Sequence, residues 1–261
     1  MSTAAALVVT NRPRFIEWFT HQIAKQTRKP DEVIVVTNAR DSEAYLDGRM
    51  AERTGVANTL VYWQKPEPWV SLGWMRQKAL DLCSSDILLW CDDDDWYHPR
   101  RFELSVAPIE SGRYDAAAVP LTHMYYVEEQ KIVSMECGVA LHLPATAWRR
   151  SLVQKARFAH TLSGEDCMWI CAIAHPPEGV ELLLPPHRVR WIGNYIEPHI
   201  GAMVLVHGSN TWQISLSRFD TSEFAVLGKK METLTKYAPK DVSQEEWDLT
   251  REMLEGLRVR R

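Results

Sequence analysis

Four consecutive aspartates at residues 92–95 follow the short apolar segment 87–91. This segment is typical of a buried strand, because it is brief and polar residues border it on both sides. In open α/β sheets, ligands bind just beyond the carboxyl ends of the strands, which is where these acids stand. Carboxylates this close repel one another unless a cation lies among them. Because Asp92 and Asp94 would share a face of an extended segment, they are predicted to hold one divalent cation together with substrate phosphates.

An acidic run is also typical of a solvated turn, which is the simpler interpretation of these residues. Their surroundings favour a structured site instead. The acids follow a core strand directly, Trp96 and Tyr97 come next, and Pro99 stands in the first turn of a helix predicted over residues 99–106. A proline is tolerated there because its missing N–H has no partner in a first turn.

The first half of the chain alternates strands with helices. Strands are predicted at residues 6–10, 33–36, 59–63 and 87–91, and helices at residues 15–26, 41–53, 71–82 and 99–106. Short connections between such elements indicate a parallel sheet with right-handed crossovers. The helix at residues 71–82 is expected to direct its apolar side, namely Leu72, Met75, Ala79 and Leu82, into the core.

The pattern changes after residue 112. Strands are predicted at 116–121, 124–133, 188–192 and 203–206, with strand character through 132–143, and helices at 148–156 and 165–174. We therefore expect an α/β protein with one Rossmann-like domain at residues 1–220, a mostly parallel central sheet and a mixed second half. Its halves are residues 1–111 and 112–220. A C-terminal extension of helices follows at residues 221–261.

Four segments together resemble glycosyltransferases of the GT-A fold, in particular those of family 2. The segments are residues 72–79, residues 86–99, the Gly164-Glu165-Asp166 sequence and residues 207–212. The acidic segment, with its DXD motif, is specific, and the others occur in the family's order. The resemblance implies a metal-dependent, inverting transfer of a sugar from a nucleotide diphosphate sugar, with a UDP-sugar as the expected donor, to an acceptor hydroxyl. Residues 1–111 would bind the nucleotide sugar and residues 112–220 the acceptor.

The resemblance also implies a metal site for Mn²⁺ or Mg²⁺. Asp94 would be the main ligand, Asp92 would contribute directly or through water, and His207 would be a third ligand whose imidazole favours Mn²⁺. A histidine at a strand end is more commonly a hydrogen-bonded turn residue, so both readings of His207 stay open. Asp93 would face the ribose or the sugar of the donor.

Two acids at the start of the predicted helix 165–174 are candidates for catalysis. Asp166 matches the family's general base, which deprotonates the acceptor hydroxyl, and Glu165 lies beside it. The alternative is that both merely complement the positive end of a helix.

Four further residues are expected to bind the donor. Arg76 would contact the diphosphate or an aspartate, and Thr10 and Arg12 would border the nucleobase at the end of the first strand. Asn38 stands where family members usually carry acids that contact the base or the ribose, so specificity for uridine is open.

Composition narrows the other classes of function. The 261 residues carry a net charge of −4, which does not call for nucleic acid or an anionic membrane as partner. The five cysteines fit free thiols in a reducing cytoplasm, and no secretory signal or transmembrane segment is recognised. A cytoplasmic enzyme is expected.

Two other functions compete with glycosyl transfer. A nucleotidyltransferase of similar fold would act on a sugar phosphate, but that class usually carries a glycine-rich basic loop where this chain has residues 11–14. An acidic ion-binding module would need neither Asp166 nor 11 tryptophans. The acceptor is left open between a saccharide, a membrane-linked glycan, a protein, a small metabolite and nucleic acid with a hydroxylated base.

Overall fold

The apolar strands of the first half lie side by side in a computed structural model of the protein. The structure describes residues 2–39, 49–119, 121–126, 131–136, 141–161, 164–176, 178–192, 202–206 and 232–233. Its parallel core contains β1 (Ala4–Thr10), β2 (Glu32–Thr37), β3 (Thr59–Trp63) and β4 (Ile87–Trp90). Strand β1 pairs with β2 on one side and with β4 on the other, and β2 pairs with β3. Every residue of β1, β2 and β4 is buried, as expected for strands covered on both faces.

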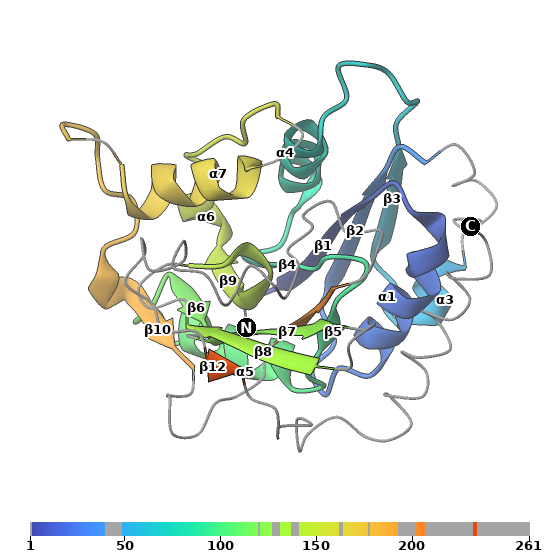
Figure 1. Ribbon diagram of the computed structural model, residues 1–261, viewed down its shortest axis with the longest axis horizontal. Coiled ribbons are helices and arrows are strands. Elements are labelled where there is room, and N and C mark those ends of the chain that lie inside the picture. The colour runs from blue at the N-terminus through green and yellow to red at the C-terminus, as the bar shows by residue number, and fades with distance from the viewer. Residues whose placement is uncertain are drawn as a thin grey trace.

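Helices cover the two faces of this sheet (Figure 1). One face packs against α4 (Leu72–Leu82) and α7 (Glu165–Ala174). The other packs against α1 (Ile16–Ala24), which follows the turn η1 (Pro13–Phe15), and against α3 (Met50–Thr54) and α5 (Arg101–Glu110). Helix α3 ends at Gly55, whose φ of 68° suits a glycine cap. The part of the chain predicted as helix at residues 41–48 lies outside the described residues.

Three strands of the second half extend the same sheet. They are β6 (Ala116–Ala118), β9 (Thr146–Arg149) and β10 (Val189–Trp191). The short 3-10 helices η2 (Leu143–Ala145) and η3 (Pro186–Arg188) lead into β9 and β10. The order among the described strands is β10-β6-β9-β4-β1-β2-β3, with β9 antiparallel to both of its neighbours. The predicted mostly parallel α/β fold is thereby confirmed.

The helix predicted at residues 148–156 is wrong in its first part. Trp148 lies on β9, fully buried, and its ring meets Trp169 of α7 edge-on. Strand β9 pairs with β4 on one side and with β6 on the other, so tertiary pairing decides for a strand. Only α6 (Arg150–Val153) is helical in this stretch, before a turn.

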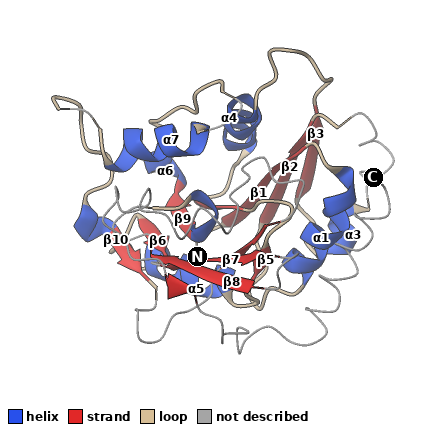
Figure 2. Ribbon diagram, in the orientation of Figure 1, coloured by secondary structure: helices blue, strands red, loops and turns tan. Residues whose placement is uncertain are grey.

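The remaining described strands form a second sheet (Figure 2). Its order in the described chain is β12-β8-β7-β11-β5. These strands are β5 (Trp96–Tyr97), β7 (Leu121–Tyr126), β8 (Lys131–Glu136), β11 (Ala202–Val206) and β12 (Glu232–Thr233). Strand β5 directly follows the acids and pairs with β11. Residues 232–233 were expected to be helical, but they form the short strand β12, because they bond to β8.

Smaller differences concern helix positions. Helix α5 begins at Arg101, so Pro99 precedes it instead of lying in its first turn. In α4, Leu72 and Leu82 are only half-buried, whereas Arg76 and Gln77 are buried because they have polar partners inside. Within the described ranges, none of the helices has both the length and the apolar character needed to cross a membrane.

Candidate active site

The aspartates form a turn at the carboxyl end of β4. Cys91 still donates its N–H to the carbonyl of Leu7 on β1, at 2.8 Å, and the N–H of Asp95 then bonds to the carbonyl of Asp92 across the turn, at 3.5 Å. Three of the acids, Asp93, Asp94 and Asp95, are buried, and Asp92 is half-exposed. Because residues 93–94 form a turn and not an extended strand, the predicted alternation of faces does not apply.

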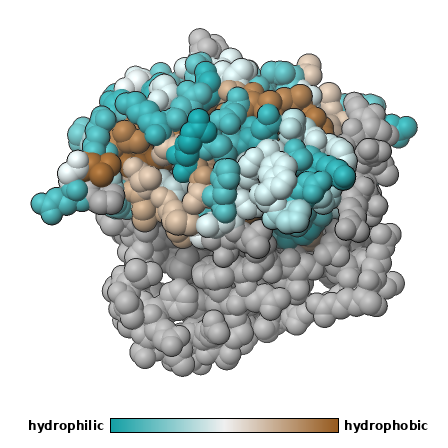
Figure 3. Space-filling view, turned by 90° about the horizontal axis from the view of Figure 1, so that it is seen from above, coloured by the Kyte–Doolittle hydropathy of each residue, from teal (hydrophilic) through white to brown (hydrophobic). Residues whose placement is uncertain are grey.

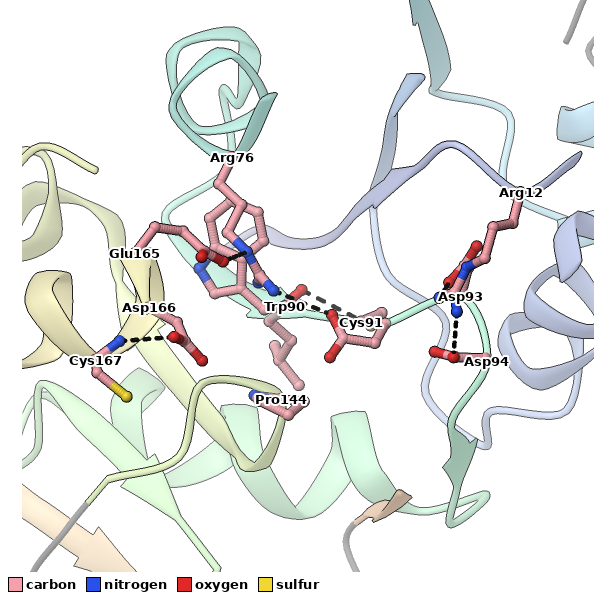
Figure 4. Close-up of polar contacts among 12 residues, drawn as sticks. Arg12, Arg76, Trp90, Cys91, Asp93, Asp94, Pro144, Glu165, Asp166 and Cys167 are labelled. Carbon is pink, nitrogen blue, oxygen red and sulfur yellow. Dashed lines mark hydrogen bonds and ion pairs between the residues drawn. The ribbon is translucent and has the colours of Figure 1, made fainter. Parts of the chain in front are cut away.

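Arg12 lies between two of these acids (Figure 4). Its Nη1 lies 2.6 Å from Oδ2 of Asp94, and its Nη2 forms an ion pair with Asp93. The hydroxyl of Thr10 donates a hydrogen bond to Asp93, and the guanidinium stacks over the ring of Phe15 at 4.7 Å. The residues predicted to border the nucleobase therefore hold the acidic turn against the end of β1.

Burial and charge shift the protonation of this cluster. Burial, with the charge of Asp94, raises the pKa of Asp93 to about 7, against the opposing effects of Arg12 and Thr10. Burial disfavours the charged guanidinium of Arg12, but the carboxylates of Asp93 and Asp94 outweigh it and raise the pKa of Arg12. Arg12 is thus the permanent cation of the cluster, and Asp93 can change its charge near neutral pH.

Arg76 connects the turn to α7. Its Nε donates to Oε1 of Glu165 at 3.0 Å, and its Nη2 lies 3.4 Å from Oδ1 of Asp92. The Arg76 and Glu165 side chains are only 7% and 3% exposed, and the guanidinium lies over the Trp90 ring at 5.5 Å. Asp92 therefore belongs to a different ion-pair network from Asp93 and Asp94.

Two local features position α4 beside the segment that precedes α7. One fixes the start of the helix and the other allows close packing. Ser71 caps the helix by accepting the N–H of Trp74 at 3.1 Å. Gly73 lies against the segment that precedes α7, because its N–H bonds to Thr161 and a Cβ would stand 1.8 Å from the carbonyl oxygen of Ala159. A side chain at position 73 would push this segment away from α4.

The two acids at the start of α7 differ in their surroundings. Burial raises the pKa of Glu165, with Arg76 opposing, and its carboxylate is committed to the ion pair. Asp166 is half-exposed, and its Oδ1 accepts the N–H of Cys167 at 2.8 Å (Figure 4). Of the pair, Asp166 is the more exposed acid.

Asn38 lies at the same edge of the sheet. It directly follows β2, whose last residue Thr37 is in register with Thr10. Its Oδ1 is buried and finds no hydrogen-bond partner within the described chain, so a ligand group could supply one. His207, the third predicted metal ligand, lies outside the described residues.

His142, which the sequence did not single out, is a buried histidine whose pKa responds to the charged groups of the site. It immediately precedes η2, and its carbonyl accepts hydrogen bonds from Ala145 and Thr146. Burial lowers the pKa of His142, the charges of Asp166 and Asp92 oppose this, and Arg76 reinforces it. Its imidazole therefore lies within the field of the same charged groups. No motif marks it, because it is brought there by the strand β9 that was predicted as helix.

The donor set at the turn fits a hard divalent cation. Carboxylate oxygens are the ligands that Mg²⁺ and Mn²⁺ prefer, and the guanidinium of Arg12 shows that a positive charge is stabilised at Asp93 and Asp94. Over the described residues, three or more histidine, cysteine or acidic side chains do not come together in a ready-made metal cluster.

The family of the chain follows from its sequence. Residues 5–136, just over half of the chain, match glycosyl transferase family 2, and the protein belongs to this family. No curated protein sequence matches it.

Solved structures share its fold. The 1–349 portion of S. aureus TarS in complex with UDP-GlcNAc has a TM-score of 0.61 and 15% identity, over 82% of this chain and 62% of that chain. Mannosyltransferase PcManGT from Pyrobaculum calidifontis, in complex with GDP-Man and Mn²⁺, has a TM-score of 0.55 and 16% identity, over 80% and 58%. A longer TarS structure has a TM-score of 0.58 and 15% identity, over 78% of this chain and 37% of that chain. The likeness covers less than two thirds of each of these proteins, and at these identities it shows the GT-A fold alone.

Proposed function

We propose that this protein transfers a sugar from a nucleotide diphosphate sugar to an acceptor hydroxyl, with inversion at the anomeric carbon. The observation that carries the proposal is the buried acidic turn at the end of β4, with half-exposed Asp166 at the start of α7. Arg76 bonds to both segments, through Asp92 and Glu165, and this supports a single connected site for donor binding and acceptor activation. Membership of family 2 supports the same reaction.

The donor would lie along the ends of β1, β2 and β4. Thr10, Arg12 and Asn38 would meet the nucleoside, and Asp93 would face its ribose or the sugar. TarS binds UDP-GlcNAc and PcManGT binds GDP-Man, which supports a sugar nucleotide and leaves the base open. We propose a UDP-sugar, with the orphaned Oδ1 of Asn38 as one contact to the base.

A divalent cation would be held by Asp94, by Asp92 directly or through water, and by His207. When bound, it would neutralise the diphosphate leaving group as the glycosidic bond breaks. The Mn²⁺ in PcManGT supports Mn²⁺ as the ion. The protein's own part is to hold the carboxylates at the end of β4 and to exclude water from Asp93.

Asp166 would act as the general base. Its carboxylate would take the proton of the acceptor hydroxyl as that oxygen attacks the anomeric carbon from the side opposite the diphosphate. Glu165 was grouped with it for catalysis, but its ion pair with Arg76 favours a positioning role. The acceptor and the cytoplasmic location stay predictions.

A donor screen tests the proposal. The protein is heated with Mn²⁺ and a panel of UDP-, GDP-, dTDP- and CMP-sugars, and its melting temperature is followed together with slow hydrolysis of the sugar nucleotide. One sugar nucleotide should stabilise the protein, and EDTA or Asp94→Asn should remove the effect. Asp86→Asn is the matched control, because Asp86 is an exposed acid just before β4, at its opposite end. Stabilisation by a nucleoside triphosphate alone would instead indicate a nucleotidyltransferase.

The general base is tested separately. Asp166→Asn should keep the stabilisation by the donor and lose hydrolysis and transfer, because the side chain keeps its shape but cannot accept a proton. Turnover retained in Asp166→Asn would remove this residue from the mechanism.

A further inference from the structure

The cation at the acidic turn is supplied by the chain itself. Arg12 reaches both Asp93 and Asp94, and Asp94 is the residue to which the proposed function gives the divalent ion. We infer that Arg12 competes with the divalent ion for Asp94, and that its guanidinium moves onto the diphosphate when donor and ion bind together. The inference rests on the proposed function.

The charges of the cluster support competition. Asp93 and Asp94 are buried, and one guanidinium lies between them within hydrogen-bonding distance. Bringing a divalent ion to Asp94 while Arg12 stays in place sets like charges a few ångströms apart in a poorly solvated site. The ion therefore binds well only when the guanidinium has moved away or its charge has been balanced.

The diphosphate provides the balancing charge. An arginine binds phosphate oxygens with the same planar fork that it uses for carboxylates, so exchange from Asp94 to phosphate preserves its hydrogen bonds. Donor and divalent ion would then bind cooperatively. The diphosphate takes up the guanidinium that hinders the ion, and the ion displaces Arg12 from Asp94 toward the diphosphate. Ion affinity without a nucleotide would be low.

The local structure lets the side chain of Arg12 move without the backbone. The N–H of Arg12 bonds to the hydroxyl of Thr10 at 3.0 Å, and η1 begins at the next residue. The side chain of Arg12 is 21% exposed, so one side of it already meets solvent. The side chain of Arg76, which also bonds to two acids, is more enclosed at 7% exposure.

Mn²⁺ binding without nucleotide tests the inference. Mn²⁺ is titrated by electron paramagnetic resonance into the wild type, Arg12→Gln and Arg12→Lys. Arg12→Gln should bind Mn²⁺ at least about tenfold more tightly, because a positive charge beside a divalent ion is removed. Arg12→Lys keeps the charge and should stay close to the wild type. Arg28→Gln is the control for net charge, since Arg28 pairs with Glu110 away from the turn.

A second titration tests the movement to the diphosphate. UDP should tighten Mn²⁺ binding strongly in the wild type and much less in Arg12→Gln. Equal or weaker Mn²⁺ affinity in Arg12→Gln would overturn the inference alone, provided that the wild type binds Mn²⁺ with UDP. If no variant binds Mn²⁺ even with UDP and the sugar nucleotides, the proposed metal role fails together with the inference.

Discussion

The ion pair between Arg76 and Glu165 should dominate the stability of the site. Arg76→Met replaces the guanidinium with an apolar end but keeps the aliphatic part of the side chain, and it leaves the buried Glu165 without its cationic partner. Asp92 also loses a contact, but at 32% exposure its side chain is solvated. Removing one partner of a buried pair costs about 3–5 kcal/mol. For a chain of this size that lowers the melting temperature by roughly 10 °C.

The loss of folding stability in Arg76→Met should depend on pH. Burial already raises the pKa of Glu165, and the opposing effect of Arg76 is lost in Arg76→Met, so this pKa rises further. An acid with a raised native pKa adds stability that is complete below its unfolded pKa of about 4.3 and is lost as pH rises through the native pKa. The variant should therefore be close to the wild type near pH 5 and far less stable at pH 8.

Urea unfolding at both pH values measures this effect. The double variant Arg76→Met/Glu165→Gln should recover most of the lost stability at pH 8, because no buried carboxylate remains to be left unpaired. A deficit of equal size at both pH values, with no recovery in the double variant, would show that packing and not the ion pair carries the stability.

Three other changes test the supports of the site. Gly73→Ala should lower the free energy of unfolding by about 1–3 kcal/mol, because its Cβ would stand 1.8 Å from the Ala159 carbonyl oxygen; thermal denaturation checks this, and an unchanged melting temperature would contradict it. Ser71→Ala should cost about 1 kcal/mol in urea unfolding through the lost cap on Trp74, whereas no loss would deny the cap. With the pKa of Asp93 at about 7, the unliganded protein should lose stability as pH rises from 6 to 8, and Asp93→Asn should flatten this dependence; a dependence that persists in the variant would assign it to another group.

The parallel half of the fold could be predicted from the sequence because its strands are short, continuous apolar segments. Continuous apolar segments such as β2 and β4 indicate burial on both faces, and these strands stand where the sequence predicts. Trp148 was assigned to a helix because the pattern of its short segment does not separate a helix from a strand, and the strands on either side of β9 decide the outcome. The pairing of β5 with β11 joins residues about a hundred positions apart, which no local pattern reveals.

The sequence predicted which residues belong to the candidate site better than it predicted how their side chains are arranged. The acidic turn was expected to need a cation, and Arg12 was assigned to the nucleobase, yet the structure places Arg12 on two of the acids. Asp92 and Asp94 were expected to face one ion, but the turn sends Asp92 toward Arg76. Such directions depend on the dihedral angles of single residues, which sequence patterns do not determine.

The central claim is that the protein transfers a sugar from a sugar nucleotide, and identification of the phosphorus-containing products tests it most directly. The protein, Mn²⁺ and the sugar nucleotide that stabilises it are followed by phosphorus NMR, with Asp94→Asn in parallel. Glycosyl transfer to an acceptor or to water breaks the bond between the anomeric carbon and the diphosphate. It therefore releases the nucleoside diphosphate, which we expect from the wild type and not from Asp94→Asn. Pyrophosphate formed from a nucleoside triphosphate and a sugar phosphate, with no nucleoside diphosphate from any sugar nucleotide, would contradict the account.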